Sequence, residues 1–153
     1  MISIQRVLVP LDTGVHAPHV LDVARSMADA FGATLLVMHV IAAPIASEKR
    51  AIAEAEAKSW LAGLLDDSDR VQRHATVDCV FGTPGCEIAR YATEHGADLI
   101  VMGTHSHGPT FQMATGSIAE LVMGLSPCLV LAVKAEGMPA TMLSDPPGTV
   151  AHL

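Results

Sequence analysis

The sequence predicts an α/β fold, a five-stranded parallel sheet with helices on both faces. Two observations carry this prediction. Five short apolar runs alternate along the chain with four longer runs in which apolar residues recur at helical spacing. The apolar runs are nearly continuous, which is typical of parallel strands that are buried on both faces. Because parallel strands are joined by right-handed helical crossovers, this alternation favours the doubly wound class.

The first half of the chain alternates two strands with two helices. In order, these are a strand at 7–11, a helix from about Pro18 to Phe31, a strand at 34–40 and a helix from Ser47 to about Leu65. Pro18 suits a first helical turn and Gly32 suits a left-handed C-terminal cap. Ser47 is expected to be the N-cap of the second helix.

The second half has three strands and two helices. After a polar connection at 66–73, these are a strand at 75–81, a helix opened by Thr83-Pro84 and closed by Gly96, a strand at 99–102, a helix opened by Gly116-Ser117 and a strand at 129–133. From position 135 the chain carries prolines and glycines without periodicity. We therefore expect one domain at 1–134 and an irregular tail at 135–153.

Composition excludes several classes of function. The 153 residues suit a single domain, and nine basic against sixteen acidic residues give a net charge of −7. No basic run is present, so neither nucleic acid nor an anionic membrane surface is an expected partner. No apolar stretch reaches the roughly 20 residues of a membrane helix, and no signal peptide is recognised, so we expect a cytoplasmic protein. The three cysteines form no CxxC pair and are expected to be small buried hydrophobes rather than ligands of a structural metal.

The expected ends of three strands carry the candidate site. Ligands of open α/β sheets bind beyond the carboxyl ends of the strands. Asp12, after the first strand, can accept hydrogen bonds from ribose hydroxyls or bind a divalent cation. Val40, at the end of the second, can offer an apolar slot and main-chain hydrogen bonds to a base. Gly103, at the end of the fourth, allows a close approach to the backbone.

The long loop at 104–115 leads into a helix whose start favours an anion. Gly116 lets a phosphate approach the backbone, and the Ser117 hydroxyl adds a donor to the unpaired N–H groups of the first turn. Each feature also has a purely structural interpretation, because Gly116-Ser117 can be only a helix start and Asp12 only a capping residue. Neither GxGxxG nor GxxxxGK[ST] occurs, which argues against a dinucleotide oxidoreductase and a P-loop NTPase.

Together, several segments resemble the universal stress protein family over about residues 1–134. These segments are 7–12, 36–40, 82–84 with Ile88, and 102–106 through 116–120. The family's nucleotide signature is a glycine, two residues, a second glycine, nine residues, then glycine with serine or threonine. Gly103, Ser106, Gly116 and Ser117 fall at that spacing. The resemblance implies a flavodoxin-like sheet of order 3-2-1-4-5, of the adenine-nucleotide alpha-hydrolase type, and a homodimer through strand 129–133.

The resemblance also implies a binding site for ATP, ADP or AMP, with Mg²⁺ reaching Asp12 through the nucleotide. By position in the motifs, the implied nucleotide-binding residues are Pro10, Asp12, Val40, Gly103, His105, Ser106, His107, Gly116, Ser117 and Ile118. The chain departs from the pattern at Ser106, which replaces the second glycine. Its loop at 107–115 also lacks Lys and Arg, which suits AMP or ADP as well as ATP.

Two functions are consistent with these residues. The first is a stress-response regulator that binds an adenine nucleotide without dedicated catalytic machinery, with at most slow ATP hydrolysis. The second is a nucleotide-free dimeric module of the same fold, whose working surface is strand 129–133 with the tail.

Overall fold

Five parallel strands form one sheet in the order β3-β2-β1-β4-β5 in the computed structural model, which describes residues 1–42, 44–104 and 117–134. The strands are β1 (Arg6–Pro10), β2 (Thr34–Ala42), β3 (Thr76–Gly82), β4 (Leu99–Gly103) and β5 (Leu129–Val133). The predicted fold class and the strand order implied by the family resemblance are confirmed.

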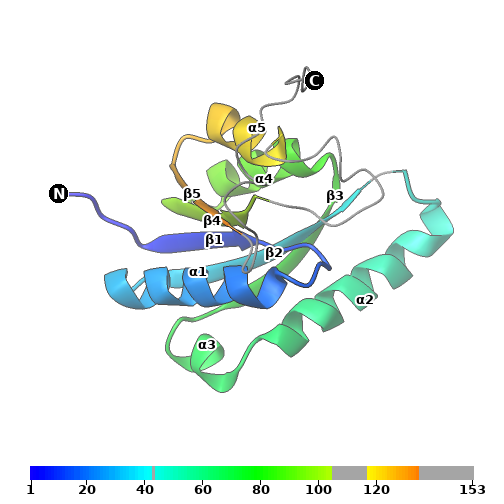
Figure 1. Ribbon diagram of the computed structural model, residues 1–153. Helices are drawn as coiled ribbons and strands as arrows, with labels where there is room; N and C mark the ends of the chain where they lie inside the picture. The colour runs from blue at the N-terminus through cyan, green and yellow to red at the C-terminus, as the bar shows by residue number, and fades with distance from the viewer. Residues whose placement is uncertain (43, 105–116, 135–153) are drawn as a thin grey trace, which may run out of the picture.

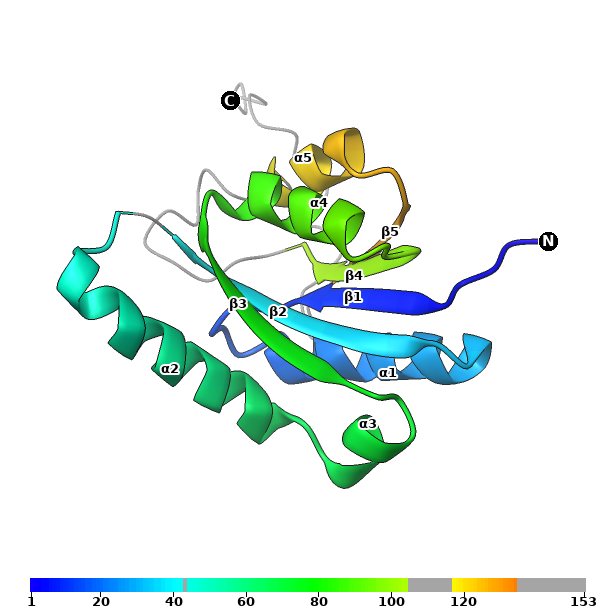
Figure 2. The ribbon, with the colours of Figure 1, turned by 180° about the vertical axis from the view of Figure 1, so that it is seen from behind.

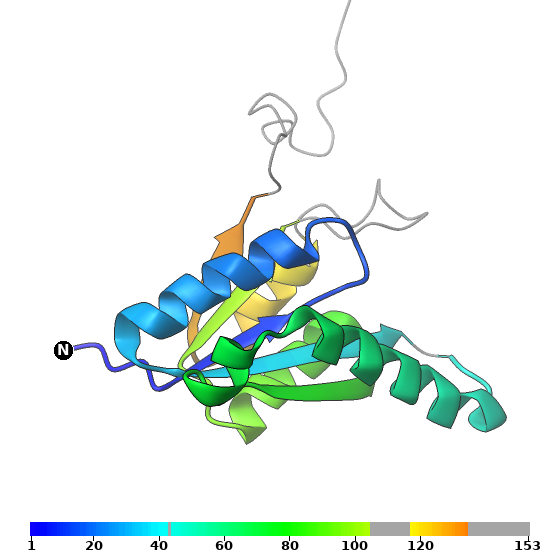
Figure 3. The same cartoon turned by 90° about the horizontal axis from the view of Figure 1, so that it is seen from below.

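Helices cover both faces of the sheet. They are α1 (Ala17–Phe31), α2 (Ser47–Leu64), α3 (Asp67–Val71), α4 (Pro84–Glu94) and α5 (Ser117–Leu125). Figures 1 and 2 show α1, α2 and α3 on one face and α4 with α5 on the other. In Figure 3 the first face is turned toward the viewer, and α1 and α2 cross in front of the strands. Within the described ranges, no helix combines the length and the apolar character that a bilayer span requires.

The two faces of β2 supply two separate parts of the core. Leu35 and Val37 pack with α1 and the end of α2, whereas Leu36 and Met38 pack with α4 and α5. Successive side chains of a strand point to opposite faces, so a strand buried on both sides must be apolar at every position. This requirement is the physical reason why the apolar runs of the sequence are continuous.

Several predicted boundaries agree with the structure and others were wrong. Gly32 is the left-handed cap of α1, with φ of 64°, and Pro84 is the first residue of α4. Ser47 is not the N-cap of α2 but its first residue, and Ala46 occupies the cap without a side-chain hydrogen bond. β2 runs to Ala42 rather than Val40, because β3 continues to pair with it there.

The polar connection predicted at 66–73 contains the short helix α3. Its N-cap is Asp66, which accepts a hydrogen bond from the Asp69 N–H at 2.8 Å. The Asp69 carboxylate in turn accepts from the Asp66 N–H at 2.9 Å. This reciprocal capping box stabilises a helix of only five residues, and it explains why so polar a segment is ordered.

Asp69 of α3 is joined to α1 and to the loop before β3 through its buried carboxylate. The side chain is fully buried, and Arg25 of α1 and Arg73 donate to it at 2.6 and 2.8 Å. Arg73 also donates to the exposed Asp29 at the end of α1. Burial acts to raise the pKa of the Asp69 carboxyl, but the hydrogen bonds from Arg25, the Asp66 N–H and Arg73 together outweigh it and bring the pKa to about 2.

We expect the charge of Asp69 to stabilise the fold down to low pH. Its pKa is lower in the folded than in the unfolded chain, so the unfolded chain takes up the proton first as the pH falls. The stabilisation is therefore complete above the unfolded pKa and is lost as the pH falls through about 2. Between about pH 5 and pH 2 the free energy of unfolding should fall by about 2 kcal/mol more in the wild type than in Asp69→Asn.

The measurement is urea unfolding across that pH range, with Asp29→Asn as the matched control. Asp29 pairs with Arg73 at the surface, where its side chain is 54% exposed, so its replacement should leave most of the pH dependence in place. Equal slopes for the wild type and Asp69→Asn would contradict this account of the cluster.

Candidate functional site

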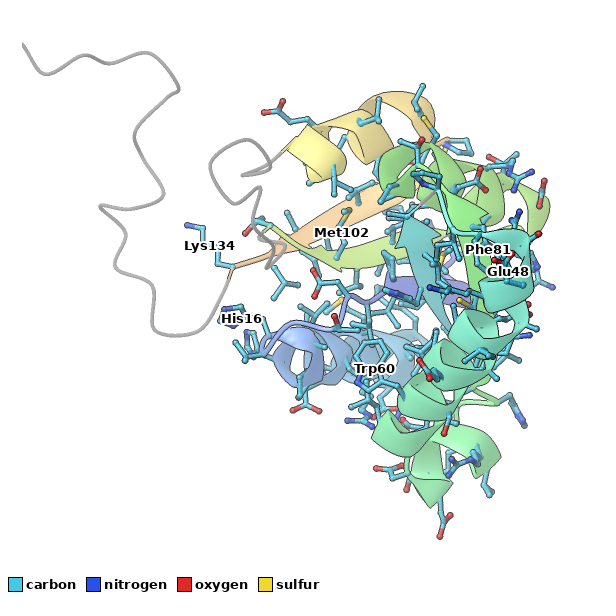
Figure 4. The ribbon with its side chains drawn as sticks, turned by 90° about the vertical axis from the view of Figure 1, so that its right-hand side faces the viewer. His16, Glu48, Trp60, Phe81, Met102 and Lys134 are labelled. Carbon is cyan, nitrogen blue, oxygen red and sulfur yellow. The ribbon has the colours of Figure 1, made fainter. Side chains whose placement is uncertain are left out.

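A cavity opens at the carboxyl ends of β1, β2 and β4. The chain leaves β1 through α1 on one face, whereas β4, on the other side of β1, is reached through α4 on the opposite face. This arrangement is the switch point at which open α/β sheets bind ligands. The cavity measures about 310 Å³. Figure 4 looks onto this end of the sheet, with Met102 near the centre and His16 at the α1 side.

Five of the residues expected to bind a ligand line this cavity. They are Pro10, Asp12, Val40, Gly103 and Ile118. Ser117 begins α5 as expected, next to the lining residue Ile118. The other candidates lie outside the described residues: His105, Ser106, His107 and Gly116, together with the whole tail at 135–153.

β1 stops at Pro10, and this ends its pairing on the β4 side. The Asp98 N–H donates to the Arg6 carbonyl, so the even-numbered residues of β1 turn their main chain toward β4. Proline has no N–H to donate in that direction. The β1–β4 register accordingly contains only Val7 with Leu99 and Leu8 with Ile100. The carboxyl end of β4 is thereby left to line the cavity.

Asp12 combines a local structural role with a position on the cavity wall. Its Oδ1 accepts a hydrogen bond from the Gly14 N–H at 2.9 Å, which shapes the turn leading to α1. The side chain is half-buried and lines the cavity. Within the described part of the chain, Oδ2 accepts no hydrogen bond. One carboxylate oxygen therefore fixes the loop while the other can accept from a ligand.

Leu11 and His39 form a contact that the sequence analysis missed. The Leu11 N–H donates to the Met38 carbonyl at 2.9 Å, which continues the β1–β2 ladder by one bond. The Leu11 carbonyl lies 2.6 Å from His39 Nδ1. The His39 ring meets the Trp60 ring of α2 edge-on, with centroids 5.7 Å apart. A histidine directly before Val40 was the available signal, but its partners are 28 and 21 positions away.

Val40 offers main-chain groups at the cavity because β2 extends beyond the end of β1. Thr34 donates its N–H toward β1, and Met38 accepts from that side, so the even-numbered residues of β2 turn their main chain to β1. Val40 lies beyond Pro10, which pairs with Met38 as the last residue of β1. Its N–H and C=O have no hydrogen-bond partner on that side within the described residues.

The remaining walls are mainly apolar and come from helices on both faces. These lining residues, which the sequence analysis did not select, are Leu11, His16, Ala17, Val20, His39, Pro84, Ile88, Met102, Thr104 and Ala119. Thr104 is tied to the neighbouring strand, because its N–H donates to the Val133 carbonyl at 3.1 Å. The cavity is therefore a largely apolar slot with a few polar groups at its rim, the common character of small-molecule sites.

Comparison with known proteins identifies the family. The model of the universal stress protein family matches residues 3–134. The chain belongs to the universal stress protein family. A universal stress protein of Thermus aquaticus is 31% identical over 137 residues, covering 84% of this chain and 97% of the relative. The resemblance seen in the motifs is thus confirmed.

Solved structures of universal stress proteins share the fold. One, in complex with cAMP, has a TM-score of 0.63 at 22% identity, covering 86% of this chain and 97% of the other. Another, from Archaeoglobus fulgidus in complex with dAMP, has a TM-score of 0.62 at 22% identity, covering 88% of this chain and all of the other. At this identity the likeness shows the fold alone.

The cysteines of this universal stress protein differ in exposure. Cys79 is buried in β3 and Cys128 is half-buried, as expected for small hydrophobes. Cys86 is exposed in the first turn of α4, so the prediction of a buried side chain was wrong there. Burial raises the pKa of the Cys79 and Cys128 thiols. Among the described residues, no group of three or more His, Cys, Asp or Glu side chains could hold a metal ion.

We expect Cys86 to react first with a thiol reagent in the native protein. Thiolates are the reactive species, and the other two thiols are both shielded and less acidic than a free cysteine. Titration with Ellman's reagent at about pH 8 should give one fast equivalent, which Cys86→Ser removes. Cys79→Ser is the matched control and should leave the fast equivalent unchanged. A fast phase that survives in Cys86→Ser would contradict this assignment.

Proposed function

We propose that this universal stress protein binds an adenine nucleotide in the cavity and acts as a stress-response regulator without dedicated catalytic machinery. The observation that carries the proposal is the convergence of Val40 main-chain groups and the Asp12 carboxylate on one largely apolar cavity. Its volume of about 310 Å³ lies at the lower end of the range for small-molecule sites. A nucleoside is small enough for such a volume.

The base is the part that Val40 would recognise. Its N–H and C=O lie side by side on the open edge of β2, as one donor and one acceptor. Adenine presents an acceptor at N1 and a donor at its N6 amino group on one edge, so the two pairs are complementary. Apolar lining residues, such as Val20 and Ile88, would then cover the faces of the ring.

Asp12 and the start of α5 would hold the sugar and the phosphates. The Asp12 Oδ2 can accept from a ribose hydroxyl, and the same oxygen can reach a nucleotide-bound Mg²⁺. α5 begins at Ser117 and places Ile118 on the cavity wall. Its unpaired N–H groups and partial positive charge favour a phosphate there. Gly103 at the end of β4 leaves room for close approach, as the glycine signature implies.

The relatives support adenine rather than another base. One universal stress protein was solved with cAMP and another with dAMP, and both ligands contain adenine. For this chain, ATP, ADP and AMP all remain candidates. No general base or basic finger for phosphoryl transfer stands out in the sequence, so we expect ATP hydrolysis to be slow or absent.

A second candidate function, a nucleotide-free interaction module, is favoured by the surface around β5. β5 is an edge strand, and Leu129 on it is 50% exposed. On the adjacent α5, Met123 and Leu125 are 51% and 54% exposed. Edge strands with exposed apolar side chains are ready to pair with another chain. The homodimer through 129–133 is therefore part of both candidate functions.

The first test is to denature freshly purified protein and identify any small molecule that is released. We expect near-stoichiometric ATP, ADP or AMP, measured by chromatography and mass spectrometry. If the extract is empty, calorimetric titration with AMP and with Mg-ATP decides. The absence of both a released nucleotide and a heat of binding would exclude nucleotide binding and leave the interaction module.

Asp12→Asn should weaken AMP binding by about tenfold or more. The amide can still accept from the Gly14 N–H through its oxygen, so the turn persists. The amide nitrogen then replaces Oδ2, and a donor faces the ribose hydroxyls in place of an acceptor. Asp67→Asn, on the exposed surface of α3, is the matched control. Equal calorimetric Kd values for Asp12→Asn and the wild type would remove Asp12 from the proposed site.

Ala132→Pro should convert the expected dimer to a monomer. The Val133 carbonyl accepts from Thr104 of the β4 side, so the N–H of the preceding Ala132 points to the free edge. Proline removes that single outward donor while leaving the β4–β5 ladder intact. Sedimentation velocity measures the change, with Ala132→Thr as the control that keeps the N–H. A monomeric wild type, or an unchanged dimer in Ala132→Pro, would contradict this assignment of the interface.

A further inference from the structure

We propose that His39 is a positioning residue for base recognition. By holding the Leu11 carbonyl, its ring keeps the main chain of Val40 available to a ligand. This inference rests on the proposed function, because it specifies how the same cavity presents its donor and acceptor.

In the β1–β2 ladder, alternate residues of β2 turn their main-chain N–H and C=O toward β1. In a parallel pair, each even-numbered residue of β2 donates its N–H to one residue of β1 and accepts at its C=O from the residue two further on. The Thr34 N–H donates to Gln5 at one end, and the Met38 carbonyl accepts from Leu11 at the other. In an uninterrupted ladder, the next bond would run from the Val40 N–H to the Leu11 carbonyl.

His39 occupies this acceptor in place of Val40. Within the described residues, the Leu11 carbonyl accepts no bond from Val40. His39 Nδ1 lies 2.6 Å from it instead. A carbonyl oxygen can only accept, so Nδ1 carries the proton and donates. A side-chain donor thus replaces the main-chain donor, and the Val40 N–H is left for the cavity.

The His39 ring also contacts Trp60 of α2, on the face of the sheet that α1 and α2 cover. The His39 side chain belongs to the same face as Leu35 and Val37, toward α1 and α2. There it meets Trp60 of α2 edge-on, at an interplanar angle of 78°; in Figure 4, Trp60 lies below the centre of the view. Trp60 packs against the core cluster of this face. The imidazole is therefore supported by the scaffold and does not depend on a ligand.

Removal of the donor should let Val40 take over the Leu11 carbonyl. In His39→Phe the ring contact with Trp60 persists, but the Nδ1 donor is lost. Because a buried carbonyl without a hydrogen bond destabilises the fold, the Leu11 carbonyl then needs another donor. The Val40 N–H then completes the ladder and no longer serves the base. In His39→Asn the amide nitrogen occupies nearly the position of Nδ1, so the donor is retained. The pair separates the hydrogen bond from the bulk of the side chain.

The first experiment measures the Val40 amide in the ligand-free protein by NMR hydrogen exchange. We expect fast exchange in the wild type and in His39→Asn, and protection of at least about tenfold in His39→Phe. If His39 served only to pack against its neighbours, the exchange rate of the Val40 amide would be the same in both variants as in the wild type. If the Val40 amide is already protected in the wild type, or remains unprotected in a folded His39→Phe, the inference is overturned.

The second experiment compares AMP with inosine monophosphate in calorimetric titrations. The base of inosine has a donor at N1 and an acceptor at O6, the reverse of adenine on the edge that would bond to Val40. We expect the wild type and His39→Asn to prefer AMP by about tenfold or more, and His39→Phe to lose most of this preference. A wild type that binds neither nucleotide contradicts the proposed function, whereas a folded His39→Phe with an undiminished preference contradicts only the role of His39. If His39→Phe does not fold, loss of the preference in a folded His39→Asn would also overturn it.

Discussion

The early end of β1 is the constraint on which the site depends. β1 is the middle strand of the sheet, yet it has five residues where its neighbour β2 has nine. Pro10 cannot donate to β4, so pairing on that side stops. On the other side, β2 continues past it, paired with β3. A central strand that ends early thus leaves unpaired main chain on one neighbour and an open strand end on the other, and the cavity lies between them.

The ionic cluster that stabilises the fold and the cavity lie at opposite ends of the strands. The buried carboxylate of Asp69 and its partners Arg25 and Arg73 join the second half of α1 to α3 and to the loop before β3. The cavity lies at the carboxyl ends, where the contact of His39 with the Leu11 carbonyl is one of those that shape it. The turn after Asp12 is shaped by the hydrogen bond from the Gly14 N–H to Asp12 Oδ1 and by the bond from the Ala17 N–H to the Gly14 carbonyl.

What the sequence could predict follows from how local each signal is. The strands were predictable because burial on both faces demands apolar runs. Asp12 and Gly103 were predictable because they lie where those runs end, whereas Pro10 was implied only by the family resemblance. α3 carried a local signal that was overlooked, the two aspartates at capping-box spacing. The contacts of Asp69 with Arg25 and of His39 with Leu11 join residues 44 and 28 positions apart. No periodicity encodes such pairs, since only the assembled sheet brings them together.

A site built on main chain is indicated in the sequence by where a strand ends, as it was for Val40, and not by the type of the side chain at that position. The groups that Val40 offers are those of any residue at that position, so its side chain is constrained only by the apolar wall. The specific information instead lies in His39, whose ring takes the place of the Val40 N–H as the donor to the Leu11 carbonyl. Recognition through a strand edge therefore appears in a sequence as the place where a strand ends and the residue that replaces a ladder donor, not as the type of side chain that meets the ligand.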